Sequence, residues 1–139
     1  IRINRFMNIY LDVDGVLLDH NYDQMPYLRE FIKTVFDLSN NNVYWLTTHC
    51  KDGTTDRVLE HIREIVDPDI FEMLEKVIPT KWTTLKTEGI DLESEFLRFD
   101  DNIFQSEYIV LEKIHKEHCL IKVKENLEEL VELLREDMR

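Results

Sequence analysis

Acidic and hydroxyl side chains follow three apolar stretches of this sequence, at the point where each stretch ends. The stretches are residues 8–11, 43–46 and 96–99, and the polar residues after them are Asp12, Asp14, Thr47, Thr48, Asp100 and Asp101. Neighbouring carboxylates repel one another at short range unless a hard cation lies between them. Oxygen-only ligands of this kind suit Mg²⁺, and a threonine hydroxyl can hold a phosphate oxygen. If the three stretches end at one place, the sequence predicts a site for Mg²⁺ and a phosphate group.

The apolar stretches have the length and composition of buried strands, and segments with helical periodicity separate them. The predicted strands are residues 8–11, 43–46, 77–79, 96–99 and 120–123. The predicted helices are residues 26–39, 54–65, 70–76, 83–88, 104–116 and a last helix from about residue 125. Strands that alternate with helices, without hairpin signals, pair in parallel. The sequence therefore predicts a single Rossmann-like three-layer α/β/α domain over residues 1–139, with a mostly parallel sheet of about five strands.

Local signals set some of these boundaries and the position of the site. The helix over residues 26–39 has the clearest pattern, because its apolar residues recur every three or four positions from Leu28 to Phe36. Pro26 suits its first turn. Lys122 in the last strand favours a place at the edge of the sheet. In an open α/β sheet the functional residues lie beyond the carboxyl ends of the strands, where the aspartates and threonines stand.

The composition narrows the classes of function. The chain has 139 residues, with 17 basic and 29 acidic side chains, and a net charge of −12. Phosphate backbones repel such a chain, so no nucleic-acid partner is expected. No apolar run approaches the ~18 residues of a membrane span, and no signal peptide is evident, so no membrane partner is expected.

The cysteines and the first residues add two smaller expectations. Cys50 and Cys119 form neither a CxxC motif nor a disulfide framework, which favours a reducing, cytoplasmic location. Met7 is a candidate natural start, with residues 1–6 as an N-terminal extension.

The order of these motifs resembles the haloacid dehalogenase-like superfamily of phosphotransferases. The first motif of that superfamily is an apolar strand followed by DxD and glycine, which corresponds to residues 10–16 here. The second is an apolar strand ending in Ser or Thr, as at residues 45–47, and the fourth is a strand ending in an acidic pair, as at residues 99–101. The third is a lysine that opens a helix ahead of the fourth strand. The resemblance covers roughly residues 8–123 and implies a minimal phosphatase of this superfamily.

The resemblance implies a role for each residue at the strand ends. Asp12 would be the nucleophile that forms an aspartyl-phosphate. Asp14 would protonate the leaving group and then act as the base for water. Thr47 would bind the transferring phosphoryl group, and Thr48 beside it would also bind the substrate.

The resemblance also implies a metal site and a phosphate-binding lysine. Mg²⁺ would be held by the Asp12 carboxylate, the main-chain carbonyl of Asp14 and Asp100, with Asp101 close by. Lys86 is the favoured lysine, and Lys81 is the alternative. A carboxylate is a poor nucleophile towards a phosphate dianion unless Mg²⁺ and a lysine screen the charge.

The segment between Asp14 and Thr47 is too short for a cap domain beside the helix it contains, so a capless chain with an open site is expected. A phosphorylated substrate, small or macromolecular, would enter this site. One competing function is a catalytically weak or inactive module of the same fold that binds metal or a phosphorylated partner. Another is a phospho-acceptor domain of the response-regulator type, although the acidic pair comes late in the chain for that arrangement. The physiological substrate and the oligomeric state are left open.

Structural roles compete with the functional ones for several of these residues. Asp101 or Asn102 can cap the following helix, and residues 12–15 can form a turn. Arg98 is expected to pair with an acid. His49 is expected to be a surface or capping residue, or else to contact substrate.

Overall fold

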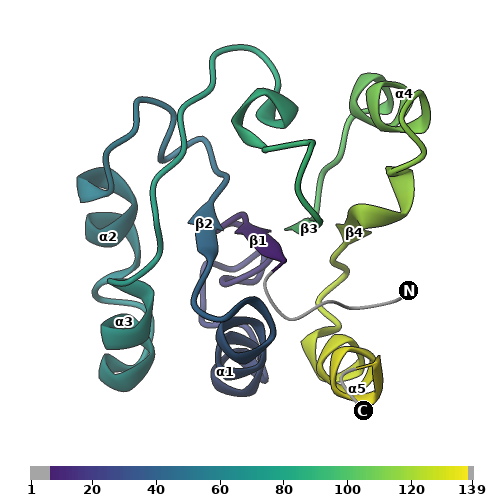
Figure 1. The fold of residues 1–139 in the computed structure, drawn as a ribbon. Coiled ribbons are helices and arrows are strands. Elements are labelled where there is room, and N and C mark those ends of the chain that lie inside the picture. The colour runs from purple at the N-terminus through teal and green to yellow at the C-terminus, as the bar shows by residue number, and fades with distance from the viewer. Residues whose placement is uncertain (1–6, 138–139) are drawn as a thin grey trace.

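Four parallel strands form the sheet in the computed structural model, which describes residues 7–137. The strands are β1 (Asn8–Leu11), β2 (Val43–Trp45), β3 (Phe96–Asp100) and β4 (Leu120–Lys122). Their order is β2-β1-β3-β4 (Figure 1). The predicted parallel sheet and the edge position of the last strand are both confirmed. The predicted extension over residues 1–6 lies outside the described residues.

The predicted fifth strand, residues 77–79, is wrong as a strand. Ile78 forms one isolated parallel bridge with Tyr44, in which its N–H donates to Val43 at 2.9 Å and its carbonyl accepts from Trp45 at 2.8 Å. The ladder does not continue beyond this bridge, because the side-chain hydroxyl of Thr80, rather than its backbone N–H, donates to the carbonyl of Trp45 at 2.5 Å. The described sheet therefore has four strands rather than five.

The helices lie close to where the periodicity predicts them. They are α1 (Leu28–Ser39), α2 (Asp56–Ile62), α3 (Pro68–Leu74), α4 (Gln105–Glu112) and α5 (Leu127–Asp137). The predicted helix over residues 83–88 is a 3₁₀ helix, η1 (Lys86–Gly89), and a second 3₁₀ helix, η2 (Glu117–Cys119), precedes β4. Several predicted helices are longer than the observed ones, because a period in the sequence does not show where the last turn unravels. None of the helices in the described range is long and apolar enough to cross a bilayer.

The central strand β1 sends its side chains alternately to two hydrophobic clusters. Ile9 and Leu11 belong to the larger cluster, which also contains the apolar residues of α1 and α5. Tyr10 belongs to a smaller cluster with Phe96 and with Leu111 of α4. Successive side chains of a strand point to opposite faces, so both faces of this sheet are covered. Figure 1 shows α1 and α5 on one side of the sheet and α4 on the other.

The parallel register brings the strand ends together. Leu11 pairs with Trp45 of β2 on one side and with Phe99 of β3 on the other. The residues that follow continue this alignment, because the N–H of Asp12 donates to Phe99 at 3.1 Å and that of Leu46 donates to Leu11 at 2.8 Å. The three polar segments predicted to converge therefore leave the sheet side by side, at the edge formed by the carboxyl ends of the strands.

Candidate functional site

Asp12 lies directly after β1, and two neighbours hold its carboxylate. The backbone N–H of Val13 donates to Asp12 Oδ1 at 2.8 Å, and Lys86 Nζ lies 3.2 Å from Oδ2. A cavity of about 440 Å³ is lined by Asp12, Lys86, Asp100 and Asp101, among other residues. Asp12 itself is only 7% exposed, so this cavity is its route to solvent.

Lys86 opens η1, and the side chain of Glu88 fixes the loop before it. Glu88 accepts the backbone N–H groups of residues 83–85 at 3.0 to 3.2 Å. These bonds lower the pKa of Glu88 to about 2, so it stays ionised as the anchor of the loop. The anchored lysine reaches two carboxylates: its Nζ lies 2.8 Å from Asp100 and 3.2 Å from Asp12.

Of the two candidate lysines, only Lys86 reaches the strand ends in this way. Lys81 is exposed, forms a backbone bridge with Asp52 and lines a separate surface hollow with Pro79 and Glu88. The difference lies in the loop between the two lysines, whose residues 83–85 are bonded to the side chain of Glu88 in η1.

Arg98 and Glu107 extend these contacts into a chain of buried charges. Arg98, on β3, donates to Asp100 at 2.8 Å and to Glu107 at 2.7 Å, in agreement with the prediction that it pairs with an acid. Glu107, on α4, also accepts the backbone N–H of Thr87 in η1 at 3.2 Å. The side chains of Arg98, Asp100 and Glu107 are each 1% exposed, and charges at such depth persist only when paired. We call this set the buried charge network: Asp12, Lys86, Asp100, Arg98 and Glu107.

The acids at this edge shift one another's protonation. Burial raises the pKa of Asp12 to about 8, and the charge of Asp100 adds to the effect, while Lys86 opposes it. Burial also acts on Asp100, but Lys86 and Arg98 outweigh it and lower the pKa of that carboxyl. Burial and the charge of Asp100 raise the pKa of Asp101. The acids at this edge, Asp12, Asp100, Asp101 and Glu107, therefore outnumber Lys86 and Arg98, and the raised pKa values mean that protons offset the surplus where a bound cation could replace them.

The donor set at this edge fits Mg²⁺. Asp12, Asp100 and Asp101 each offer a carboxylate oxygen, and these oxygens lie within 4.8 Å of one another. Asp100 is committed to other contacts, because Oδ1 accepts the N–H of Asn102 at 3.0 Å and Oδ2 contacts Lys86 and Arg98. Asp101 is exposed and lines the cavity. An oxygen-only set with open positions for water is what Mg²⁺ prefers.

Gly15 is required where the DxDG segment passes Asp101. It has a φ of +87°, a left-handed conformation that side chains disfavour. A Cβ on Gly15 would lie 2.1 Å from Cγ and 2.6 Å from Cβ of Asp101. The glycine of this motif therefore lets the loop after β1 approach the acidic pair after β3.

The two threonines differ in what they can reach. Thr48 is exposed and lines the cavity that contains Asp12. Thr47 is 1% exposed, and its Oγ1 accepts the backbone N–H of His49 at 3.3 Å. Thr47 lies at the end of β2 as predicted, but it is not among the residues that line the cavity. Thr48 is thus the more accessible hydroxyl at this edge.

Asp14 forms a second cluster beside the buried charge network. His49 Nε2 lies 3.0 Å from Asp14 Oδ2, and His61 Nε2 lies 3.1 Å from Asp14 Oδ1. The two imidazole rings stack with centroids 4.2 Å apart and an interplanar angle of 21°. Burial alone would raise the pKa of Asp14, but its hydrogen bonds with His49 and His61 and their charges lower it. We call Asp14, His49 and His61 the Asp14 cluster.

Sequence analysis did not select His61 as a site residue, and the contact of His49 with Asp14 differs from its expected surface role. His61 lies in a predicted helix, one position before the buried Ile62, with no second histidine at ligand spacing and with the exposed Glu64 as the acid three positions on. Its partner Asp14 is 47 residues away in the chain. Only the packing of α2 beside the end of β1 brings these residues together.

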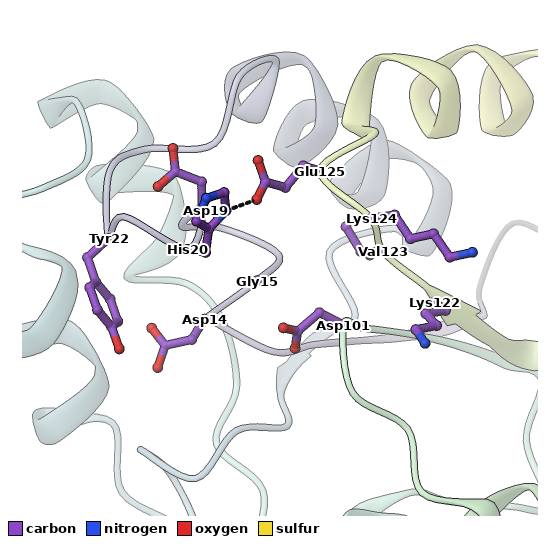
Figure 2. Close-up of a pocket in the computed structure, with 10 residues that line it drawn as sticks. All are labelled: Asp14, Gly15, Asp19, His20, Tyr22, Asp101, Lys122, Val123, Lys124 and Glu125. Carbon is purple, nitrogen blue, oxygen red and sulfur yellow. Dashed lines mark hydrogen bonds and ion pairs between the residues drawn. The ribbon is translucent and has the colours of Figure 1, made fainter.

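A wider cavity of about 790 Å³ opens on the other side of Asp14. Figure 2 shows Asp14, Gly15 and Asp101 on its wall, together with Lys122 and Lys124. The short loop after Asp14 folds back on itself and forms a further part of that wall. His20 in this loop contacts Glu125 (Figure 2). Asp14 and Asp101 line both cavities, so they stand between two open approaches to the strand ends.

Comparison of the chain with family models, with curated proteins and with solved structures found no match.

Proposed function

We propose that this chain is a Mg²⁺-dependent phosphohydrolase of the haloacid dehalogenase-like type, with a minimal Rossmann-like α/β/α fold, no cap domain and Asp12 as its nucleophile. The observation that carries the proposal is the position of Asp12 at the end of β1, 3.2 Å from Lys86 and within 4.8 Å of the oxygens of Asp100 and Asp101. A nucleophilic carboxylate needs positive charge nearby to approach a phosphate dianion. Lys86 supplies one such charge, and the acidic donor set is suited to hold another.

The proposed reaction has two steps. A carboxylate oxygen of Asp12 attacks phosphorus, the bond from phosphorus to the ester oxygen breaks, and Asp14 gives a proton to the departing alcohol. Asp14 then takes a proton from water, whose oxygen attacks the aspartyl-phosphate and releases inorganic phosphate and free Asp12. Mg²⁺ bound by Asp12, Asp100, Asp101 and the main-chain carbonyl of Asp14 would screen the charge between carboxylate and phosphate.

The chain's other residues have supporting roles in this proposal. Arg98 and Glu107 hold Asp100, which in turn orients Lys86 beside Asp12. Thr48, on the cavity wall, is placed to contact the substrate phosphate. The two open cavities suit a phosphorylated substrate that is not enclosed, whether a small ester or a phosphorylated site on a larger molecule.

A second candidate function is a module of the same fold that binds metal or a phosphorylated partner without turnover. The Asp14 cluster favours this alternative, because two histidines hold Asp14 as a carboxylate and so oppose its use as a proton donor. In that case Asp12 still offers its carboxylate, but the leaving group receives no proton.

Hydrolysis of p-nitrophenyl phosphate by the full chain separates these functions. We expect turnover that requires Mg²⁺ and disappears in Asp12→Asn. We expect Lys86→Met to lower kcat/KM by about 10²- to 10³-fold, since it removes a fixed charge that faces the transition state. The matched control is Lys81→Met, a lysine outside the site, with unchanged kinetics.

Two results would reject the proposal that the chain hydrolyses phosphate esters through Asp12. Full activity in Asp12→Asn would exclude Asp12 as the nucleophile. Binding of beryllofluoride to Asp12 in the presence of Mg²⁺, with no turnover of any phosphate monoester tried, would establish the binding module instead.

A further inference from the structure

The Asp14 cluster has the donor atoms and spacing of a transition-metal site. Two imidazole nitrogens face different oxygens of one carboxylate, at 3.0 and 3.1 Å. Donor atoms that lie 2.0–2.1 Å from a common ion are separated from one another by roughly 2.9–3.4 Å. The three ligand atoms lie within 4.8 Å of one another, so a small shift of side chains brings them around a single ion.

Three separate segments contribute these donors. Asp14 lies in the loop after β1, His49 in the loop after β2, and His61 in the last turn of α2. The side chains of His49, His61 and Asp14 are 24%, 27% and 43% exposed, so water can reach the cluster and fill further coordination positions. The stacked rings place both Nε2 atoms on the same side, towards the carboxylate.

We infer that Asp14, His49 and His61 form a binding site for a borderline divalent ion such as Zn²⁺ or Co²⁺, distinct from the oxygen-only site at Asp12. Two imidazoles and one carboxylate match the preference of these ions, whereas Mg²⁺ prefers oxygen ligands. The adjacent set of Asp12, Asp100 and Asp101 contains no nitrogen or sulfur donor. The same edge of the sheet therefore offers two sites that differ in ligand type, and this inference does not depend on hydrolysis.

Titration of the chelator-treated full chain with Co²⁺ tests the inference. We expect one tightly bound Co²⁺ per chain, visible as d–d absorption bands that Zn²⁺ abolishes and excess Mg²⁺ leaves in place. His49→Ala and His61→Ala should each weaken binding by at least about tenfold, since removing even a residue that only orients a ligand has that effect. His118→Ala, an exposed histidine outside the cluster, and Asp12→Asn should bind Co²⁺ as the wild type does.

A measurement on the wild-type chain removes any dependence on the folding of the variants. In ¹H–¹⁵N spectra of the imidazole groups, Zn²⁺ should shift the Nε2 resonances of His49 and His61 and no others at one equivalent. Shifts confined to other histidines, or an unchanged Co²⁺ affinity in His61→Ala, would reject the metal site. Asp14, His49 and His61 would then be joined by hydrogen bonds alone. Loss of the Co²⁺ bands in Asp12→Asn would instead assign the ion to the Asp12 site. Since no arm measures turnover, failure here leaves the phosphohydrolase proposal standing. An ion bound to Asp14 would instead favour the binding module, because a carboxylate that ligates a metal is not free to protonate a leaving group.

Discussion

The buried charge network and the Asp14 cluster begin two residues apart in the chain but have opposite environments. Asp12 is 7% exposed, and every partner in its network except Lys86 is buried almost completely. Asp14 is part of the rim, with 43% of its side chain exposed. The network includes two fixed cations, Lys86 and Arg98, whereas the partners of Asp14 are two imidazole rings.

This difference follows from where each residue leaves the sheet. Arg98 points from β3 into the face that α4 covers, so its charge must be paired with acids at the same depth, and Asp100 and Glu107 supply them. Asp14 lies past the end of β1, where His61 of α2 reaches it but leaves 43% of its side chain exposed. A charge under a helix thus becomes part of the scaffold, while a charge on the rim stays available to bind something else.

The largest expected effect comes from breaking the network at Arg98. Arg98→Met leaves Asp100 and Glu107 buried without their shared partner, and we expect it to lower the free energy of unfolding by about 3–5 kcal/mol. Arg98→Lys should be less damaging, because it keeps the charge but cannot bond both acids in the geometry of a guanidinium. Urea denaturation at neutral pH measures both variants.

Arg29→Met is the matched control for this loss of an arginine. Arg29 also contacts two acids, Asp67 at 2.8 Å and Asp69 at 2.6 Å, but all three side chains are 36% exposed or more. An exposed pair contributes little, so we expect a loss of about 1 kcal/mol or less. Equal losses in Arg29→Met and Arg98→Met would show that depth is not what distinguishes the network.

A smaller effect is expected where the two regions meet, at Gly15. Gly15 and Gly53 both have φ of +87°, but only at Gly15 would a Cβ meet Asp101, since nothing lies within 4 Å of one at Gly53. Gly53→Ala should therefore show the backbone strain alone, about 1–2 kcal/mol. Gly15→Ala should lose about 1–3 kcal/mol beyond that, because Asp101 must move.

The pair of glycine variants also tests the proposed metal site. If Asp101 helps to hold Mg²⁺, Gly15→Ala should weaken Mg²⁺ binding and Gly53→Ala should not. Calorimetric titration with Mg²⁺ measures both. Unchanged Mg²⁺ affinity in a destabilised Gly15→Ala would remove Asp101 from the donor set.

The sequence predicted the parts of this edge that depend on strands and missed those that depend on helix packing. Asp12 and Asp100 could be brought together from the sequence, because parallel strands end at one edge and each acid directly follows an apolar stretch. Glu107 and His61 could not, although both lie in predicted helices. A helical period shows which face is apolar, but it does not show which polar residue at the border of that face will meet a given strand end.

The two predicted elements that the structure does not confirm, a strand over residues 77–79 and a helix over residues 83–88, have similar causes. Residues 77–79 have the composition of a strand, but after the bridge at Ile78 the hydroxyl of Thr80 takes the place of a backbone N–H at the carbonyl of Trp45. The segment before Lys86 has helical periodicity, yet Glu88 folds back to bond three of its N–H groups and leaves only a 3₁₀ turn. In both places a single residue with a local bonding preference overrides the pattern around it.

A difference in pH dependence between the two regions is expected when stability is measured without metal. The pKa of Asp12 is raised from an ordinary 3.8 to about 8, so the folded chain binds a proton that the unfolded chain has lost between these values. Stability should therefore fall as pH rises from about 4 to about 8, and Asp12→Asn should remove this component. The pKa of Asp14 is lowered, so its contribution is present above the unfolded value near 3.8 and disappears as pH falls below it.

The two substitutions should thus alter different parts of one stability curve. Urea midpoints of the chelator-treated chain from pH 3 to 9 should lose their decline above pH 4 in Asp12→Asn, while Asp14→Asn should lower the midpoints throughout the range above pH 4 and keep the decline. Mg²⁺ should raise stability most near pH 8, because it favours the ionised form of Asp12 that the fold otherwise penalises. If Asp12→Asn leaves the decline in place, the proton is bound elsewhere and Asp12 is already ionised without metal. The proposed contrast between a buried acid whose ionisation is disfavoured and a rim acid that is held ionised would then be wrong for the buried acid, Asp12.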